Sequence, residues 1–469
     1  MEESKEKSKG LDISVKSFIT ATLIIFALMV LTYVLTFIIP GGEYARIADE
    51  SGNMIIDPDG QFTSIPGGLS FYKWLLSPFL VLAADGGGTI LAVILFLLIV
   101  GGAFNCLDKC GLMGYMLQKI VHKYGRVRYR LMGIIVLFFM LLGSFIGSFE
   151  ECVPLVPIVV ALSLSLGWDA LTGMGMSVLA VSCGFAAGIC NPFTVGVAQG
   201  LAGLPMFSGA WLRAVSFVLI YILLLLFLRN HAGKVEKPVI LSSQEKFEKQ
   251  ENMEKGLMCF AGILTAGILL VLSSGFLTVL QDYTMIIVAV MFLAAGIAAP
   301  ALCNMRGKTL ASCFGAGSAS ICPAILMILM ASSIKYTMVE ANVLDTVLHG
   351  AVTLAGGFPK WAVIMFIYLI VLAMNFFIGS GSAKAFLLIP LIVPIAQIFG
   401  ISSQLCILAF AFGDGFSNVF YPTNPVLLIS LGLAGVSYGE WFKWSWKFQA
   451  MNLILTSGLL LMGLAVGYC

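Results

Sequence analysis

The sequence predicts an all-α polytopic membrane protein. Its predicted architecture is a pair of inverted-topology repeats, each with a re-entrant hairpin and a discontinuous (unwound) transmembrane helix, plus scaffold helices. Three observations predict it: the composition suits a bilayer, the same helix-breaking residues recur in two parts of the chain, and two corresponding connectors carry opposite charge bias.

The composition places most of the chain in lipid. Of 469 residues, 59% are apolar and 11% charged, with mean hydropathy +1.01, whereas a soluble domain has about 25% charged residues. Together with shorter and broken segments, the long apolar stretches amount to about a dozen membrane segments. The eleven cysteines lie mostly in apolar runs and indicate packing rather than a disulfide framework. A net charge of +2 suggests no nucleic-acid partner.

Helix-breaking residues recur at one offset of 233 residues. The pairs are Pro157/Pro390, Gly167/Gly400, Asn191/Asn424 and Pro192/Pro425, and the pair Gly147-Ser148/Gly379-Ser380 differs from this offset by one residue. Gly, Asn and Pro in the middle of a bilayer free backbone groups that lipid cannot satisfy, so such breaks persist only inside protein or beside a polar cavity. Paired breaks in two halves of a chain indicate the binding site of a secondary transporter.

Charge predicts how the two copies are oriented. The connector at 105–130 is strongly basic and is therefore expected in the cytoplasm, as are the N-terminus and the polar linker. The corresponding connector at 335–360 has Lys335 and Lys360 against Glu340 and Asp345, and is expected outside. The acidic loop at 41–72 is expected outside as well. Opposite sides for corresponding connectors predict an inverted repeat.

These features divide the chain into five parts. Residues 1–80 are predicted to form a cytoplasmic tail, the first transmembrane helix and an external loop; 81–230, repeat one; 231–255, a cytoplasmic linker; 256–302, a transmembrane hairpin of the scaffold; and 311–469, repeat two.

The first predicted hairpin carries two acidic residues near its tip, Glu150 and Glu151, beside Ser148. A carboxylate in mid-membrane costs about 2.5–3.5 kcal/mol on insertion scales, so it usually faces a cavity and has a partner. The pair is a candidate for proton exchange, for a cation site or for binding a substrate amino group. The alternative is a hairpin mouth at the water interface, with both carboxylates solvated.

The second predicted hairpin carries Ser380, Ser382 and Lys384. Small residues allow the backbone to approach a ligand closely, and hydroxyls with free carbonyls suit a hard cation. Lys384 is a candidate partner for a substrate carboxylate. The alternative is that its ammonium group reaches the membrane interface.

Each hairpin is followed by a span interrupted at Asn-Pro, because proline removes a donor and disfavours helix in the preceding residue. Asn191, Thr194, Thr423 and Asn424 can present polar atoms into these gaps, and the helix N-termini that follow favour an anionic group. The alternative is a structural kink satisfied by neighbouring helices.

Asp414 lies in the span before the second Asn-Pro, where repeat one has the apolar Val181. An acidic residue inside a membrane span is a functional candidate, here for ion coupling together with Glu150 and Glu151. The alternative is structural pairing with Lys384 or with a backbone amide. The three histidines, His122, His231 and His349, fall in or next to polar connectors and are expected to be solvated.

The chain resembles the YfcC-type family of basic amino-acid antiporters, which belongs with the anaerobic C4-dicarboxylate carriers in the ion-transporter superfamily. The resemblance runs nearly end to end. It rests on Ser148-Phe149-Glu150-Glu151, Pro154-x2-Pro157, Leu166-Gly167-x-Asp169 and Asn191-Pro192-Phe193.

This resemblance implies an inner-membrane carrier whose hairpins and unwound helices form a transport domain. It also implies a dimeric scaffold that uses the first helix and the 256–302 hairpin. Related symporters bind sodium at Ser-Asn-Thr hairpin tips, which this chain lacks. Coupling to Na⁺ or H⁺ is left open, with Gly147, Ser148, Asn191, Gly379, Ser380 and Asn424 as the possible sodium site.

The expected function is secondary active transport, by exchange or ion coupling, of a small charged organic solute across the cytoplasmic membrane. The solute is expected to be an amino acid, with basic ones preferred. A carrier of C4-dicarboxylates or other organic anions is the alternative, and an ion channel is a further one. No His/Cys metal set, nucleophile elbow or Walker motif suggests an enzyme or a pump, and no cofactor is expected.

Overall fold

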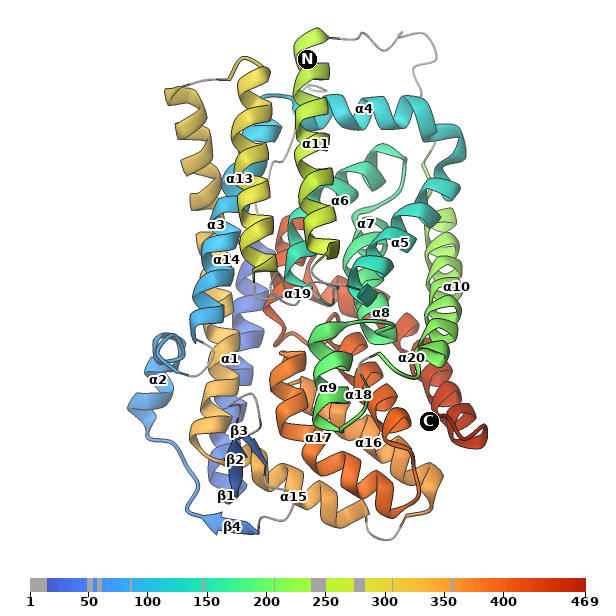
Figure 1. Cartoon of the computed structure of the whole chain (residues 1–469). Coiled ribbons are helices and arrows are strands. Elements are labelled where there is room, and N and C mark those ends of the chain that lie inside the picture. Colours follow the sequence, from blue (N-terminus) through green and yellow to red (C-terminus); the bar gives the residue numbers. More distant parts are fainter. Residues whose placement is uncertain are drawn as a thin grey trace.

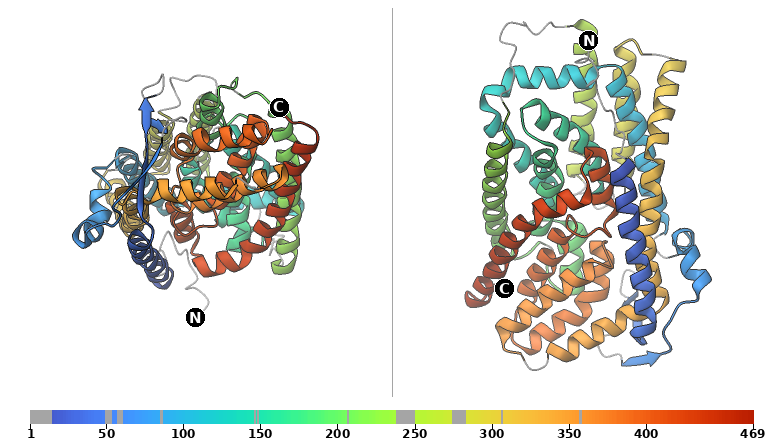
Figure 2. Two further views of the ribbon diagram at one scale, coloured as in Figure 1. Left: turned by 90° about the horizontal axis from the view of Figure 1, so that it is seen from below. Right: turned by 180° about the vertical axis from the view of Figure 1, so that it is seen from behind.

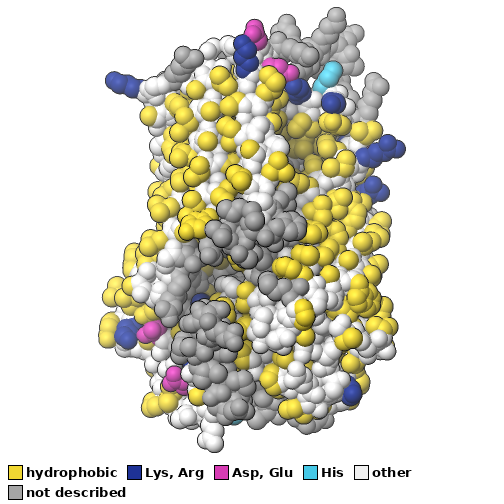
Figure 3. All heavy atoms as spheres, in the orientation of Figure 1, with side chains coloured by type: hydrophobic (Ala, Val, Ile, Leu, Met, Phe, Trp, Pro, Cys, Tyr) yellow, Lys and Arg dark blue, Asp and Glu magenta, His cyan; other side chains and the backbone are white. Residues whose placement is uncertain are grey.

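The computed structural model describes residues 15–48, 54–56, 61–84, 87–145, 147, 149–205, 207–237, 250–273, 283–305, 307–355 and 358–469. Eight helices in these ranges are long and apolar enough to cross a membrane, and five more apolar helices are shorter. Hydrophobic side chains cover much of the middle of one face, while most of its charged side chains gather towards the two ends (Figure 3). The chain is therefore a multi-pass membrane protein.

The first part of the chain contains one long helix followed by a strand-containing loop. Its elements are α1 (Val15–Ile38), β1 (Gly41–Tyr44), β2 (Arg46–Ala48), β3 (Met54–Ile56), β4 (Phe62–Ile65) and α2 (Phe71–Leu80). β1 pairs with β4 and β2 with β3, both antiparallel. The all-α prediction missed these strands, because they are only three or four residues long and lie in polar, glycine-containing sequence.

The strand-containing loop is fixed to the end of helix α15 (Val343–Ala355). Arg46 Nη2 lies 2.8 Å from Asp345 Oδ2, and the backbone N–H of Tyr44 donates to the same oxygen at 3.1 Å. Tyr44 Oη lies 2.9 Å from His349 Nδ1, and the Phe62 ring stacks on His349 with centroids 4.1 Å apart. The prediction of a solvated His349 is therefore wrong.

The next part of the chain begins with two long helices joined by a short connecting helix. Its first elements are α3 (Gly87–Lys109), α4 (Leu112–Tyr124), the 3-10 turn η1 (Gly125–Val127) and α5 (Arg128–Phe145). After the first break come the 3-10 segment η2 (Glu150–Leu155), α6 (Val156–Ser165), α7 (Ala170–Met174), the π-helical η3 (Gly175–Leu179) and α8 (Ala180–Ala187). After the second come the π-helical η4 (Pro192–Gly196), α9 (Val197–Leu201) and α10 (Ala210–Val235). Helix is interrupted between Phe145 and Glu150 and between Ala187 and Pro192, the two positions where the sequence predicts breaks.

The rest of the chain follows the same order. After α11 (Glu251–Ser273) and α13 (Thr284–Leu302) come α14 (Lys308–Glu340), α15, α16 (Lys360–Asn375), α17 (Gly381–Ile398), α18 (Ser403–Ser417), α19 (Pro425–Ala434) and α20 (Tyr438–Ala465). The helix is again interrupted where Gly379-Ser380 and Asn424 stand.

Corresponding elements lie at opposite ends of the molecule. Figure 1 shows α4 across the upper end and α15 across the lower end, with α5 and α6 above and α16 and α17 below. Packing between the halves is reciprocal: α17 packs on α9, α6 packs on α19, and α8 packs on α18. Where α8 meets α18, Ser182 Oγ donates to the Gly415 carbonyl at 2.7 Å. These two residues are separated by the same 233 positions as the paired breaks.

The segment that follows each predicted hairpin tip ends at a glycine of left-handed conformation. Gly167 has φ +84° and Gly400 has φ +64°. In each turn the N–H of the next residue reaches five residues back, from Trp168 to Ser163 at 3.0 Å and from Ile401 to Ala396 at 2.8 Å. This Schellman pattern satisfies carbonyls at the helix end, so the two turns have the same local structure.

A long-helix layer stands beside the two halves. From behind, α1 runs next to α14 (Figure 2), and α14 also packs on α3, while α13 packs on both α3 and α11. Small residues bring α3 and α14 together: a Cβ on Gly317 would lie 2.3 Å from the Gly101 carbonyl oxygen. Asn105 Nδ2 donates to the Cys313 carbonyl at 2.6 Å across the same contact.

The end of α10 is bonded to the turn between α6 and α7. His231 Nε2 lies 2.9 Å from Asp169 Oδ2, while the other oxygen of Asp169 accepts from the Thr172 N–H at 2.9 Å. Burial alone would raise the pKa of Asp169, but the hydrogen bonds from His231 and Thr172 outweigh it and hold the pKa below its usual value. The prediction of a solvated His231 is wrong, because its helix extends past the apolar run.

Candidate functional site

A buried cation and a buried carboxylate meet at the start of α17. Lys384 and Asp414 have no exposed surface, and Lys384 Nζ donates to Asp414 Oδ1 and to Asn375 Oδ1. Lys384 lies in the first turn of α17, Asp414 near the end of α18 and Asn375 at the last residue of α16. Three helices therefore converge on one ammonium group.

Pairing explains how two charges are tolerated at this depth. An isolated buried ion costs several kcal/mol in desolvation, which a well-placed partner offsets. The structure contains the pairing that the sequence left as an alternative for Asp414, and it does not place the Lys384 ammonium at the interface. The predicted contact of Lys384 with a substrate carboxylate stays a prediction.

Asn375 joins this pair to the second break. Its Nδ2 donates to Ser417 Oγ at 2.6 Å and to Asn418 Oδ1 at 3.1 Å. Asn418 Oδ1 also accepts from Asn424 Nδ2 at 3.1 Å. A continuous polar chain therefore runs from Lys384 on the second hairpin to Asn424 at the second break.

Each break asparagine caps the helical segment that follows it. Asn424 Oδ1 accepts from the N–H groups of Val426 at 2.9 Å and Leu427 at 3.3 Å. Asn191 Oδ1 likewise accepts from Phe193 at 3.0 Å and Thr194 at 3.2 Å. An asparagine cap followed by proline suits a helix start, where the backbone N–H groups are unpaired. The two breaks therefore use the same chemistry.

Each hairpin glycine approaches the break asparagine of its own half. Gly147 has φ +71°, and a Cβ there would lie 1.9 Å from Asn191 Oδ1. In the other half, the nearest atom to a Cβ on Gly379 would be Asn424 Nδ2 at 3.9 Å. Glycine at 147 is required both by the backbone conformation and by the space.

Three buried polar atoms near these breaks have no hydrogen-bond partner in the described part of the chain: Asn191 Nδ2, Thr194 Oγ1 and Asp414 Oδ2. Gly381 separates two of them, because a Cβ there would lie 2.4 Å from Thr194 Cγ2 and 2.6 Å from Asp414 Oδ2. Buried polar groups without a protein partner are typical of sites that hold water, an ion or a ligand. An amide donor and a carboxylate acceptor together can bind a solute that bears both charges.

Side chains of α10 and α20 satisfy carbonyls freed by the breaks. The buried Arg213 donates from Nε to the Ile189 carbonyl of the first break at 3.4 Å, and from Nη2 to the Ser208 carbonyl in the turn before α10 at 2.8 Å. In the other half, Trp441 Nε1 donates to the Val419 carbonyl at 2.7 Å, and Tyr438 Oη donates to the Phe420 carbonyl at 2.8 Å. Non-helical backbone at membrane depth is thereby enclosed in protein.

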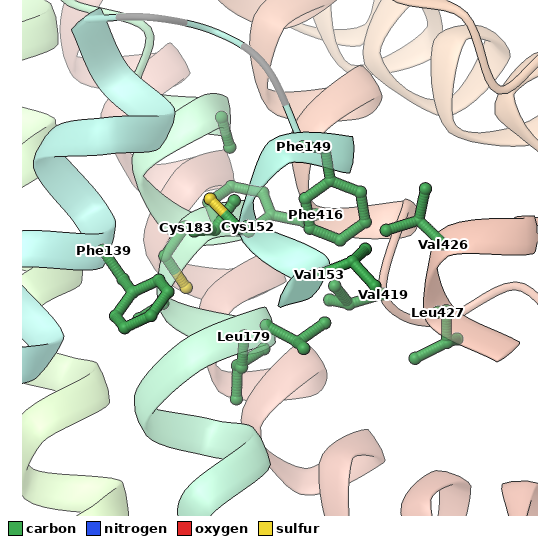
Figure 4. Close-up of a cluster of buried hydrophobic side chains, with 14 of the residues drawn as sticks. Phe139, Phe149, Cys152, Val153, Leu179, Cys183, Phe416, Val419, Val426 and Leu427 are labelled. Carbon is green, nitrogen blue, oxygen red and sulfur yellow. The ribbon is translucent and has the colours of Figure 1, made fainter. Parts of the chain in front are cut away.

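The segment after the first break packs against the second break. Figure 4 shows Phe149, Cys152 and Val153 of this segment clustered with Phe416 and Val419. Cys183 and Leu179 line one side of this buried cluster, and Val426 and Leu427 of α19 line the other. This hydrophobic contact holds η2 against α19.

The other predicted site residues are placed as follows. Thr423 and Ser382 are half-buried, and Ser380 and Gly379 are exposed. Ser148 lies outside the described residues, as do the side chains of Glu150 and Glu151, although the backbone of both begins η2. In the predicted sodium set, the side-chain oxygens of Asn191 and Asn424 already serve as helix caps.

Asn375, Ser417, Asn418 and Gly381 were not predicted as site residues. A signal for Asn375 was available, because an asparagine at the end of an apolar span directly before a hairpin is unusual. Asn418 stood in the same segment as Asp414. Gly381 belongs to the small-residue segment of the second predicted hairpin, but its place between Thr194 and Asp414 depends on how the helices pack.

The sequence matches known carriers over most of its length. Residues 18–465 match the family described as C4-dicarboxylate anaerobic carrier. A similar relative is the "Putative basic amino acid antiporter YfcC" of Escherichia coli, 30% identical over 403 residues that cover 81% of this chain and 79% of the relative.

Two solved transporters have weaker structural similarity. The YdaH transporter of Alcanivorax borkumensis has TM-score 0.45 and 20% identity, covering 96% of this chain and 99% of its own. MtrF of Neisseria gonorrhoeae has TM-score 0.47 and 17% identity, with 94% of each chain covered.

The end-to-end match defines the class of the protein, which is a secondary transporter and not an enzyme. The chain belongs to the DcuC family of C4-dicarboxylate anaerobic carriers.

Proposed function

We propose that this transporter carries amino acids, with basic ones preferred, across the cytoplasmic membrane by alternating access. The observation that carries the proposal is a group of buried atoms beside two interrupted helices, Asn191 Nδ2, Thr194 Oγ1 and Asp414 Oδ2, which have no hydrogen-bond partner among the described residues. Donors for a carboxylate and acceptors for an ammonium group meet there. Two interrupted helices, one in each half of the chain and close to each other, are the arrangement expected of a carrier site.

The preference for basic solutes rests on the acidic residues of the first hairpin. Lys384 offsets the charge of Asp414, so a second cationic group on the solute would be met by Glu150 and Glu151. The relative in Escherichia coli bears a name that agrees with this preference. Gly147, Ser148, Ser380, Ser382 and Thr423 would complete the site around the solute.

Inverted repeats are proposed as the basis of the alternating access. The proposal is supported by the position of α4 and α15 at opposite ends (Figure 1) and by the reciprocal packing of α6 on α19 and of α17 on α9. In it, the N-terminus lies in the cytoplasm, and α1 with α11 and α13 forms a scaffold that contacts lipid and a second copy of the chain.

A C4-dicarboxylate is the second candidate solute. It is favoured by the family's description and by the cationic Lys384. The acidic first hairpin opposes it, because a dianion would lie near Glu150 and Glu151 unless these carboxylates were protonated or bound a cation.

Thermal melting of the purified protein with candidate solutes tests the proposal. Arginine, ornithine or lysine is expected to raise Tm, since a ligand that binds only the folded state stabilises it by mass action. Succinate and fumarate are expected to have no effect. The screen is run with and without sodium and at two pH values.

Two variants sharpen this screen. Glu150→Gln should lose the arginine-dependent shift, whereas Glu251→Gln on the exposed first turn of α11 should keep it. A shift with dicarboxylates alone would overturn the amino-acid proposal in favour of the second candidate. Counterflow from preloaded vesicles distinguishes the carrier from a channel, which would not show it.

A further inference from the structure

The surroundings of Lys384 are those of a metal-cation site rather than of an ordinary surface ion pair. Its Nζ contacts two oxygens, Asn375 Oδ1 and Asp414 Oδ1, both on side chains that are buried to at least 97% of their surface. Amide and carboxylate oxygens are the ligands that hard cations prefer. Asp414 Oδ2, also buried, has no partner within the described ranges.

The oxygens around this ammonium are fixed by further hydrogen bonds. Asn375 cannot rotate freely, because its Nδ2 donates to Ser417 Oγ and Asn418 Oδ1 as well as to the Asp414 carbonyl at 3.1 Å. Asn418 is in turn bound by Asn424 of the second break. A preformed oxygen site therefore exists around the Lys384 nitrogen and is linked to the unwound helix.

The first half has no counterpart of the Asp414 carboxylate. At the offset of 233, Asp414 corresponds to Val181, which is apolar with 0% of its surface exposed, and at the Gly-Ser offset of 232, Lys384 corresponds to Cys152, with 5% exposed. Cys152 belongs to the hydrophobic cluster of Figure 4. The charge pair is therefore an addition to the second half and not a structural requirement of the repeated fold.

We propose that the Lys384 ammonium is a tethered cation that takes the place of a bound sodium ion in the second half. Its positive charge lies where Asp414 and the oxygen of Asn375 would otherwise bind a sodium ion from solution. One consequence, that transport needs no sodium at this site, rests on the proposed function. The site itself is a property of the folded protein.

Sodium itself is the probe, and no solute is needed. Purified full-length protein is melted in NaCl and in N-methylglucamine chloride at equal ionic strength. The wild-type Tm should be the same in both salts. Lys384→Ala should melt lower than wild type in N-methylglucamine, and Na⁺ should raise its Tm saturably by about 2 °C or more, as expected when a ligand binds only the folded state.

Control variants assign this response to the vacated position. Lys360→Ala removes an exposed lysine at the start of α16 and should behave as wild type. The double variant Lys384→Ala/Asp414→Asn lacks the carboxylate and should lose the sodium response. Lys384→Arg retains a cation and should be insensitive to sodium.

Two results would overturn the inference. One is a saturable sodium stabilisation of the wild-type protein, which can be measured even if Lys384→Ala does not fold. The other is a folded Lys384→Ala, or the longer Lys384→Gln, whose Tm is equal in the two salts. A negative solute screen with a positive sodium result would reject the proposed substrate and retain the tethered cation.

Discussion

Asp414→Leu is expected to destabilise the protein by about 3–5 kcal/mol, because it leaves the Lys384 ammonium buried without a counter-charge. Lys384 has no exposed surface, and its remaining contact would be Asn375 Oδ1. The expected result is a large loss of folded yield and a lower Tm in detergent. The same substitution removes a polar atom of the candidate site, so uptake should be lost as well.

The double variant Lys384→Met/Asp414→Leu separates charge from shape. Replacing both members of a buried ion pair by apolar groups of similar volume is often neutral or stabilising. Tm should therefore recover most of the loss seen in Asp414→Leu, although uptake should not recover. If the double variant melts no higher than the single one, the two charges are not coupled.

Asn424→Ala is expected to reduce uptake by tenfold or more, an effect on the order of 1.4 kcal/mol or larger. Asn424 has two roles that alanine cannot fulfil: its oxygen caps α19, and its amide nitrogen holds Asn418. Loss of the cap alone costs about 1 kcal/mol of stability. Uptake is measured in proteoliposomes with a solute that the thermal screen identifies.

Ser437→Ala is the matched control for Asn424→Ala. Ser437 caps α20 through the Glu440 N–H at 3.3 Å, and this capping box is exposed. Both variants lose a helix cap, so both should lose a similar amount of stability, but only Asn424→Ala should lose uptake. Asn424→Asp keeps an oxygen for the cap and removes the donor to Asn418. Its uptake should lie between that of Asn424→Ala and that of Ser437→Ala. Equal uptake in all three would remove Asn424 from the site.

Local sequence rules predicted the breaks well, because Gly, Asn and Pro act through their own backbone. Gly167 and Gly400 have the left-handed conformation that ends a helix, and Asn191 and Asn424 cap the segments after proline. These outcomes depend on residues within five positions along the chain. The repeated landmarks made them recognisable in both halves.

Contacts between helices were less predictable. The sequence left the partner of Asp414 open, because the meeting with Lys384, 30 positions away, depends on how α17 and α18 are rotated. Asn375 was overlooked although its place at the end of an apolar span was a signal, and only its contacts with Lys384 and Asn418 depend on how the helices pack. His231 was misinterpreted because α10 continues to Val235 and carries the imidazole to Asp169, in the turn between α6 and α7.

The orientation of the two halves is the claim on which the transport mechanism depends. It is tested most directly with single cysteines at Lys123 in α4 and at Lys360 at the start of α16, both exposed, in a variant that lacks the eleven native cysteines. A maleimide that cannot cross membranes is applied to intact cells. Lys360→Cys should react at once, and Lys123→Cys only after permeabilisation. Labelling of both from the same side would contradict the inverted arrangement.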